Sequence, residues 1–319
     1  MHRHRVHDHD HAIVLAGGSG TRLAALARDA GGVPVPKQYC SLRGGRSLLG
    51  DALLRAEGVV PSTQVTVVVA AAHERFWRPE LADRPAKNII VQPQNRGTAA
   101  GILLPLMTIL ERDPAARIVL LPADHFVARE PVLTQALAAA LHGPDVRSGR
   151  VVVLGMQPDA AEREYGWVRP GPPAGATRTV LEFAEKPDAA ATLALARAGA
   201  VWNSFLLVAA GRALLGLLAR RLPALLDAFQ GARVGQQAGA DLRALYERIE
   251  PADFSRDVLQ GGEPFLRLQV VPACGWTDLG TPARVQQCLA ALRPQRAPDR
   301  VRAIADLATL LAAGLAIGT

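Results

Sequence analysis

Short runs of branched apolar residues recur through the first half of the chain. They stand at residues 12–15, 65–69, 88–91, 117–121 and 151–154, with few polar residues inside them. Such runs are typical of strands that are buried on both faces, as in a parallel sheet. Between them, stretches rich in Ala, Leu, Glu and Arg at residues 47–57, 98–111 and 131–142 have helical length. Strand alternating with helix predicts an α/β, Rossmann-like, doubly wound domain.

The pattern loosens after residue 150. Residues 171–175, Gly-Pro-Pro-Ala-Gly, predict a loop or a hairpin tip. Further strands are predicted at 179–183, 205–208 and 265–271, and helices at 188–198 and 211–229. We interpret this half as a continuation of the same sheet, which makes the sheet mixed. The chain then divides into a flexible His-rich start (1–11), one domain (12–294, with halves 12–150 and 151–294) and a helical tail (295–319).

The composition of the chain limits the classes of partner that it can bind. The chain has 319 residues and a net charge of +7, which suits phosphorylated substrates. Aromatic residues make up only 4%, and no dense block of Lys and Arg occurs, so nucleic acid is not expected as a partner. The three cysteines are too far apart for a disulfide framework or a Cys-x-x-Cys metal site, which favours a cytoplasmic protein. No apolar stretch is long enough to cross a membrane.

The segment that follows the first predicted strand carries the strongest chemical signal. It reads Ala-Gly-Gly-Ser-Gly-Thr-Arg-Leu from Ala16, and Lys37 follows later in Pro-Lys-Gln. Glycines leave several backbone N–H groups free to turn toward one anion, and Arg22 and Lys37 add cations suited to phosphate oxygens. The segment therefore predicts a polyphosphate site, although a tight turn between strand and helix would also use glycines. It is not a P-loop, because no Lys follows Gly20, nor a dinucleotide fingerprint, because Leu23 stands where the third glycine belongs.

A second segment, Gln-Pro-Gln-Asn-Arg-Gly-Thr-Ala-Ala from Gln92, also follows a strand and opens a helix. The Gln92 amide can both donate and accept hydrogen bonds, and Gly97 would let the backbone approach the edge of a base. The segment therefore predicts recognition of a nucleobase. Asn95 or Thr98 as a helix cap is the alternative.

Two acidic residues stand in segments that are far apart in the sequence. Asp124 ends the run Leu-Pro-Ala-Asp-His after a predicted strand, and Asp278 lies in Trp-Thr-Asp-Leu-Gly-Thr. Mg²⁺ prefers one or two carboxylates together with phosphate oxygens and water. If folding brings the two together, they would hold one Mg²⁺. Either residue alone is more often a turn or cap residue.

Together with Tyr165-Gly166, Glu185-Lys186-Pro187 and Trp202-Asn203-Ser204, these segments resemble, in order, those of sugar-1-phosphate nucleotidyltransferases of the mannose-1-phosphate guanylyltransferase type. The resemblance implies an enzyme with the nucleotide-diphospho-sugar transferase fold. It joins a sugar-1-phosphate, mannose-1-phosphate first, to an NTP, GTP first, and releases pyrophosphate. A homodimer is also compatible with the family.

The resemblance assigns roles to individual residues. The phosphate cradle and base site comprise Ala16, Gly17, Gly18, Gly20, Thr21, Gln92, Gly97 and Thr98. Arg22 and Lys37 neutralise the triphosphate, and Asp124 and Asp278 hold Mg²⁺. The sugar phosphate is held by Tyr165, Gly166, Glu185, Lys186 and Asn203.

The chain departs from the family pattern at three places. The segment between Arg22 and Lys37 lacks the usual Trp-Pro-Leu-Ser-Arg and is longer. Phe205 stands where the family has glycine, and its ring would narrow the sugar pocket. The segment Ser255-Arg256-Asp257 lacks the tyrosine that usually follows. Three alternatives stay open: another sugar and base in the same reaction, a catalytically silent nucleotide-sugar sensor, and a nicotinamide-dependent oxidoreductase.

Overall fold

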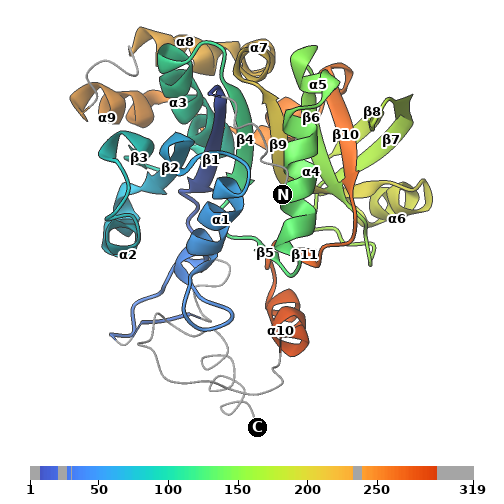
Figure 1. The fold of residues 1–319 in the computed structure, drawn as a ribbon, viewed down its shortest axis with the longest axis horizontal. Coiled ribbons are helices and arrows are strands. Elements are labelled where there is room, and N and C mark those ends of the chain that lie inside the picture. Colours follow the sequence, from blue (N-terminus) through green and yellow to red (C-terminus); the bar gives the residue numbers. More distant parts are fainter. Residues whose placement is uncertain (1–7, 21–26, 30, 233–238, 293–319) are drawn as a thin grey trace.

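The computed structural model describes residues 8–20, 27–29, 31–232 and 239–292, which form one nine-stranded sheet with helices on both faces (Figure 1). The first half supplies four parallel strands in the order β3-β2-β1-β4. They are β1 (Asp10–Ala16), β2 (Val65–Ala70), β3 (Ile89–Gln92) and β4 (Arg117–Pro122). These are the apolar runs of the sequence, and the predicted α/β class is confirmed.

The second half extends this sheet. β9 (Val201–Ala210) runs antiparallel between β4 and β6 (Val151–Met156), and β10 (Leu266–Val271) pairs with β6 in parallel. The edge is a hairpin of β7 (Trp167–Ala174) and β8 (Thr177–Ala184). The sheet is therefore mixed, as predicted, with the antiparallel strand β9 inserted between the parallel ones.

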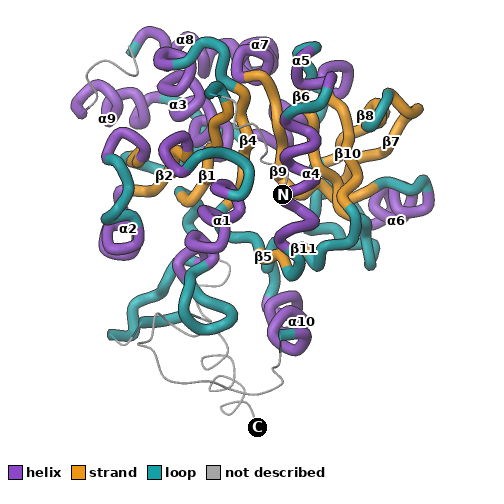
Figure 2. The backbone as a smooth tube through the Cα atoms, in the orientation of Figure 1, coloured by secondary structure: helices purple, strands orange, loops and turns teal. Residues whose placement is uncertain are grey.

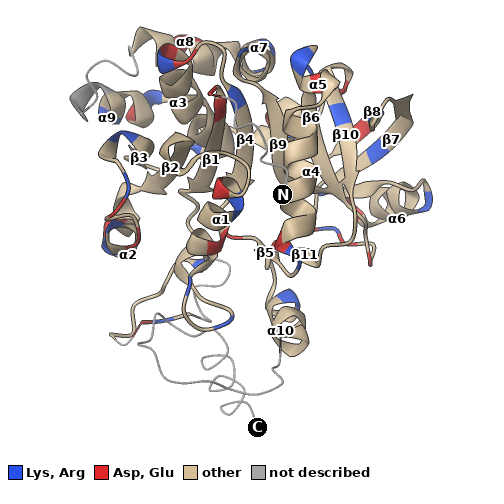
Figure 3. Cartoon of the chain, in the orientation of Figure 1, with Lys and Arg blue, Asp and Glu red and all other residues tan. Residues whose placement is uncertain are grey.

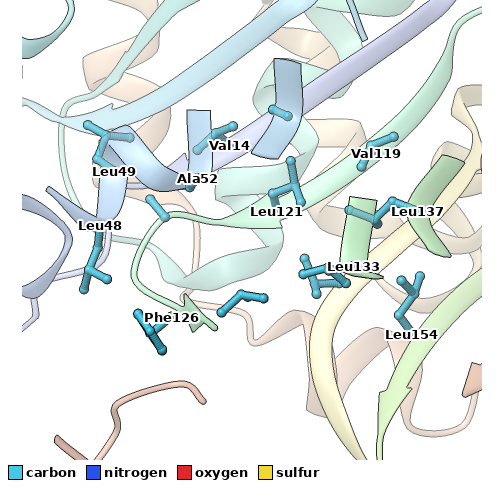
Figure 4. Packing of buried hydrophobic residues seen from close by; sticks show 14 of the residues in the cluster. Val14, Leu48, Leu49, Ala52, Val119, Leu121, Phe126, Leu133, Leu137 and Leu154 are labelled. Carbon is cyan, nitrogen blue, oxygen red and sulfur yellow. The ribbon is translucent and has the colours of Figure 1, made fainter. Parts of the chain in front are cut away.

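Two apolar layers hold the helices to the sheet. On one face α1 (Leu48–Glu57) and α4 (Glu130–Leu141) pack on β1 and β4 through Leu49, Leu137 and their neighbours (Figure 4). The opposite face is covered by α3 (Gly97–Arg112), α7 (Gly211–Arg221), α8 (Pro223–Gly231) and α9 (Gly239–Arg248). Shorter or peripheral helices are α2 (Glu74–Glu80), α5 (Pro144–Arg147), α6 (Ala189–Arg197) and α10 (Pro282–Ala291). Burial on both faces explains why these strands read as continuous apolar runs.

Local chemistry sets several helix boundaries. Ser47, Asp188 and Thr281 cap α1, α6 and α10 by accepting a hydrogen bond from a backbone N–H three residues on. Each such cap contributes about 1 kcal/mol. The prediction of one helix over 211–229 is wrong, because Pro223 cannot continue the ladder of α7 and starts α8 instead.

Two other boundaries differ from the predicted ones, at the start of β1 and at the turn between β7 and β8. β1 begins at Asp10, two residues before the predicted domain start, and His9 and His11 both contact the carboxylate of Asp113. Residues 171–174 belong to β7 and only residues 175–176 form the turn, since prolines are tolerated in an edge strand. Residues 1–7 and the predicted tail 295–319 lie outside the described residues. Across the described chain, none of the helices combines the length and the apolar character that a membrane crossing needs.

Candidate functional site

A cavity of about 270 Å³ opens at the edge of the sheet where β1 and β4 end. Figure 2 shows loops collected at this end, near the short strands β5 (Phe126–Val127) and β11 (Trp276–Thr277). Both halves of the chain contribute to its wall. Of the residues predicted from sequence, it is lined by Gly18, Gly20, Thr98, Asp124, Tyr165, Gly166, Glu185, Lys186, Asn203 and Asp278.

The glycine loop packs directly on the segment that carries Lys37. Gly20 has φ +62°, and a Cβ atom there would stand 2.8 Å from the backbone N of Lys37. Only glycine satisfies both the conformation and the close approach. At Gly18, by contrast, an added Cβ would meet nothing within 4 Å, so its backbone faces open space. Thr21 and Arg22 lie outside the described residues, and their roles stay predictions.

Gln38 holds the glycine loop by two hydrogen bonds. Its side-chain Nε2 donates to the carbonyl oxygens of Ala16 (2.8 Å) and Gly18 (2.9 Å). Gln38 therefore holds the loop through two of its carbonyl groups, and the main-chain N–H groups of such glycine-rich loops can bind an anion. The sequence reasoning missed Gln38, although it directly follows the Pro-Lys pair that was singled out.

The pairing of β5 with β11 brings the two acidic residues together. In this antiparallel pair Thr277 stands opposite Phe126, so Asp278 lies beside the His125 that precedes β5. Both Asp124 and Asp278 line the cavity, so folding brings together the two residues that the sequence singled out, and their role as ligands of Mg²⁺ stays a prediction. The short strands themselves were not predicted, because two residues carry no periodicity.

Lys37 is the cation that both aspartates share in this structure. Its Nζ lies 2.7 Å from Asp124 Oδ2 and donates to the backbone carbonyl of Asp278 at 2.5 Å. The side chain is only 11% exposed, so the interaction is poorly screened. Burial raises the pKa of Asp124, but the charge of Lys37 and its hydrogen bond to the carboxylate outweigh this effect, and the net pKa lies below the usual range.

Asp278 is held by three hydrogen bonds to one of its oxygens. Its Oδ1 accepts from Tyr165 Oη (2.9 Å), the Gly280 N–H (2.9 Å) and Arg284 Nη1 (2.7 Å). Arg284 also pairs with Glu162 Oε2 (2.8 Å) and lies 3.8 Å from the centre of the Tyr165 ring. Burial raises the pKa of Asp278, whereas the charges of Arg284 and Lys37 lower it, and the net shift of the pKa is downward. Asp278 is therefore a fixed carboxylate.

His125 is a neutral neighbour of both carboxylates. Trp276 Nε1 donates to its Nδ1 at 3.2 Å, which leaves the proton on Nε2, 3.8 Å from Asp124 Oδ1. Burial lowers the pKa of His125 to about 4, so the ring is uncharged at neutral pH. The sequence reasoning did not assign His125 a role, although it adjoins Asp124.

The acidic pair fits the ligand chemistry of Mg²⁺. No group of three or more His, Cys, Asp and Glu residues surrounds one point among the residues that the structure describes. Mg²⁺ does not need such a group, because substrate phosphates and water complete its six oxygen ligands. Asp124 Oδ1 and Asp278 Oδ2 accept none of the hydrogen bonds described above, which leaves one hard oxygen on each side.

The pairing of β7 with β8 and β9 forms the cavity wall across from the two aspartates. Trp167 stands opposite both Ala184 and Trp202, so the next residues, Gly166, Glu185 and Asn203, meet at one level. The Asn203 N–H donates to the Gly166 carbonyl at 2.8 Å, and a Cβ on Gly166 would stand 2.6 Å from Glu185 Oε2. Glycine at 166 is therefore needed to seat the Glu185 carboxylate.

Lys186 completes this wall with a strained backbone. It has φ +48° and lines the cavity, with its Nζ 4.0 Å from Glu164 Oε2. Across the described ranges, the residues other than glycine with positive φ are Lys186, Phe205 and Leu279. All three lie in or directly beside the cavity wall, and such strain clusters at functional sites.

The predicted base-reading residues have structural partners of their own. Gln92 is buried and donates to Tyr246 Oη at 2.9 Å, and a Cβ on Gly97 would stand 2.2 Å from the Ala252 carbonyl oxygen. Neither lines the cavity. Thr98 does, and its hydroxyl accepts from the Phe254 N–H at 2.7 Å rather than capping α3. The base-reading role of these residues stays a prediction.

Comparisons with known proteins bear on the family of this chain. The nucleotidyl transferase family model matches residues 11–293. The xanthan biosynthesis protein XanB of Xanthomonas campestris is 31% identical over 84% of this chain and 57% of its own length. A mannose-1-phosphate guanylyltransferase of Escherichia coli K12 is 33% identical over 69% of this chain and 47% of its own. This chain thus spans about half the length of these relatives.

Solved structures share the fold. A crystal structure described as mannose-1-phosphate geranyltransferase, from Thermus thermophilus, has a TM-score of 0.75 at 31% identity, covering 85% of this chain and 76% of that one. A UDP-glucose pyrophosphorylase has a TM-score of 0.57 at 14% identity over 90% of this chain and 99% of that one, a likeness of fold alone. Motifs, sheet order and comparisons agree, and the chain belongs to the nucleotidyl transferase family, as its resemblance to sugar-1-phosphate nucleotidyltransferases predicted.

Proposed function

We propose that this chain joins a sugar-1-phosphate, mannose-1-phosphate first, to GTP, and releases a nucleotide-sugar and pyrophosphate in the presence of Mg²⁺. The observation that carries the proposal is the meeting of Asp124, Asp278 and Lys37 beside the glycine loop. The names of several relatives favour mannose-1-phosphate, and those of the Escherichia coli relatives also favour guanylyl transfer.

In this reaction an oxygen of the sugar phosphate forms a bond to the α-phosphorus of the nucleotide, and the bond from that phosphorus to the bridging oxygen of pyrophosphate breaks. Such transfers depend on positioning and charge neutralisation rather than on a covalent step with the protein. The backbone of Gly18 and Gly20 receives phosphate oxygens, and Lys37 offsets their charge. Lys37 must then exchange its contact with Asp124 for a phosphate oxygen.

The acidic pair has a separate task. Mg²⁺ bound between Asp124 and Asp278 would neutralise charge on the attacking and α-phosphate oxygens. His125, being neutral, adds no charge that would compete for the carboxylates. Arg284 and Tyr165 hold Asp278 in one orientation, so little reorganisation is needed when the substrates arrive.

The sugar end lies against Gly166, Glu185 and Asn203. A carboxylate and an amide side by side can accept and donate hydrogen bonds to neighbouring hydroxyl groups. Lys186 at the rim supplies a cation for the sugar phosphate.

The test is a matrix of nucleoside triphosphates and sugar-1-phosphates with pyrophosphate release as the readout. We expect the largest turnover with GTP and mannose-1-phosphate. Asp124→Asn should lower kcat by about 100-fold or more with the fold retained. The matched control is Asp227→Asn, which removes an exposed carboxylate on α8 and should leave kcat unchanged. Nucleotide binding without pyrophosphate release from any pair would identify a sensor instead and would refute the proposal.

A further inference from the structure

β9 contains two more residues than its partner where it passes the cavity. Along β6 the pairing advances by two residues from Val153 to Gly155, but the partners on β9 jump by four, from Leu207 to Asn203. The additional residues form a β-bulge. Bulges next to functional sites turn a side chain away from the regular alternation of a strand.

Phe205 is the residue that this bulge turns. Its φ is +60°, a left-handed conformation that is costly for a bulky aromatic residue. Phe205 lines the cavity. An aromatic residue therefore occupies a backbone position suited to glycine, directly in the wall of the site.

Side-chain hydrogen bonds hold this strained backbone in place. Asn203 Oδ1 accepts from the Phe205 N–H at 3.1 Å. Ser204 Oγ donates to the Leu154 carbonyl of β6 at 2.6 Å and accepts from the Leu206 N–H at 3.2 Å. Strain of this kind persists only where surrounding contacts determine the conformation, as they do here.

The Phe205 ring packs on a second aromatic ring and also forms part of the cavity wall. It lies edge-on to the ring of Phe254, with centroids 6.1 Å apart and an angle of 68° between the planes. Phe254 is fully buried and tied to Thr98 by its N–H, so it is a rigid support. The neighbours of Phe205 in the wall include Asn203 and Ser255, which are hydrogen-bonded to each other at 3.3 Å.

Asn203 connects this aromatic wall with the sugar end of the site. It contacts Gly166, over which the Glu185 carboxylate lies. The chemistry of the wall at Phe205 is therefore apolar, beside a polar group of three residues suited to hydroxyls. An aromatic surface next to hydroxyl-binding groups suits the C–H face of a sugar ring.

We propose that Phe205 is the residue that sets sugar specificity, by leaving room for an unmodified hexose 1-phosphate and excluding one with an acetamido substituent. This inference rests on the proposed function. An acetamido substituent at this wall would have to displace the Phe205 ring, which packs against the buried Phe254. A rigid wall rejects an oversized substrate sterically, as in other pockets shaped around one substrate.

The experiment compares the unaltered protein with Phe205→Gly, Phe205→Ala and Phe205→Leu. The readout is the ratio of kcat/KM for the hexose 1-phosphate that the unaltered protein uses best to kcat/KM for its 2-acetamido counterpart. Phe205→Gly should lower this ratio by about tenfold or more, and Phe205→Leu should lower it less. Phe265→Ala is the matched control, because that ring is exposed on another part of the molecule and should leave the ratio unchanged.

Two further results separate the possible failures. Phe205→Gly should unfold at a higher temperature than Phe205→Ala, since glycine adopts φ +60° without strain. A ratio that stays unchanged in all three variants, while the unaltered protein is active, overturns the role of Phe205 alone. An unaltered protein that releases no pyrophosphate with any pair refutes the proposed function and this inference together.

Discussion

Replacing Asp278 by asparagine separates the structural contribution of this carboxylate from its chemical one. The change keeps the shape and an acceptor oxygen but removes the negative charge that Arg284 and Lys37 face. A hydrogen bond to a charged group contributes about 1.5–3 kcal/mol, against about 0.5–1.5 for a neutral one. The charge-assisted bond from Arg284 is the principal loss, so the free energy of unfolding should fall by about 1–2 kcal/mol.

The expected effect on catalysis is larger than the effect on stability. If the Asp278 carboxylate holds Mg²⁺, its loss should lower kcat by about 100-fold, which corresponds to about 2.7 kcal/mol. The Mg²⁺ concentration for half-maximal activity should rise at the same time. Stability is measured by urea denaturation, and turnover by pyrophosphate release over a series of Mg²⁺ concentrations.

Glu162→Gln is the matched control, because Glu162 pairs with the same Arg284 but does not line the cavity. It should cost a similar amount of stability and leave kcat within a few-fold. If Glu162→Gln lowers kcat as strongly as Asp278→Asn, the network acts only by positioning, and the metal assignment of Asp278 is wrong. A kcat for Asp278→Asn close to that of the unaltered protein would refute the reasoning outright.

Two other predictions concern the glycine loop and pH. Gly20→Ala should lower the free energy of unfolding by about 1–2 kcal/mol and raise KM for the nucleotide, because the new Cβ would stand 2.8 Å from the Lys37 backbone N. Gly18→Ala is the control: its Cβ would meet open space, so this variant should be as stable as the unaltered protein. Burial raises the pKa of Glu80 from 4.5 to about 7, and Ser47 donates to its carboxylate. Because the unfolded chain loses this proton first, the free energy of unfolding should fall by about 3 kcal/mol between about pH 4.5 and 7. The free energy of unfolding is measured by urea denaturation at about pH 5 and about pH 8. Its decrease between these pH values should be smaller in Glu80→Gln than in the unaltered protein, and an equal decrease in both would exclude Glu80 as the cause.

The charged residues are spread over the whole described chain. Lys and Arg are interspersed with Asp and Glu over the elements, so the net charge of +7 corresponds to no single basic face in this view of the described residues (Figure 3). The two lysines at the cavity are placed individually: Lys37 contacts both Asp124 and Asp278, and Lys186 lies in the wall formed with Gly166, Glu185 and Asn203. Net charge is a property of the whole surface and does not locate a pocket.

Sequence patterns predicted the elements of the fold and several segments of the site. The buried strands could be found because burial on both faces requires continuous apolar residues, and Gly20 because its conformation admits no side chain. The helix over 211–229 was predicted too long, since apolar periodicity continues across Pro223. Gln38 and His125 went unassigned because their partners are backbone carbonyls and a tryptophan that no local pattern indicates.

The sequence by itself determined the α/β class and the glycine loop, because each depends on local spacing or conformation. It singled out Asp124 and Asp278 only through the resemblance of their two segments to a family, and their role as metal ligands stays a prediction. Only the tertiary structure decided that β9 inserts antiparallel between β4 and β6, and that the two-residue strands β5 and β11 bring Asp278 beside Asp124. It also decided that Phe205 joins the cavity wall from a bulge. These arrangements arise from pairings between segments far apart in the chain, whose free energy depends on contacts that no short window of sequence contains.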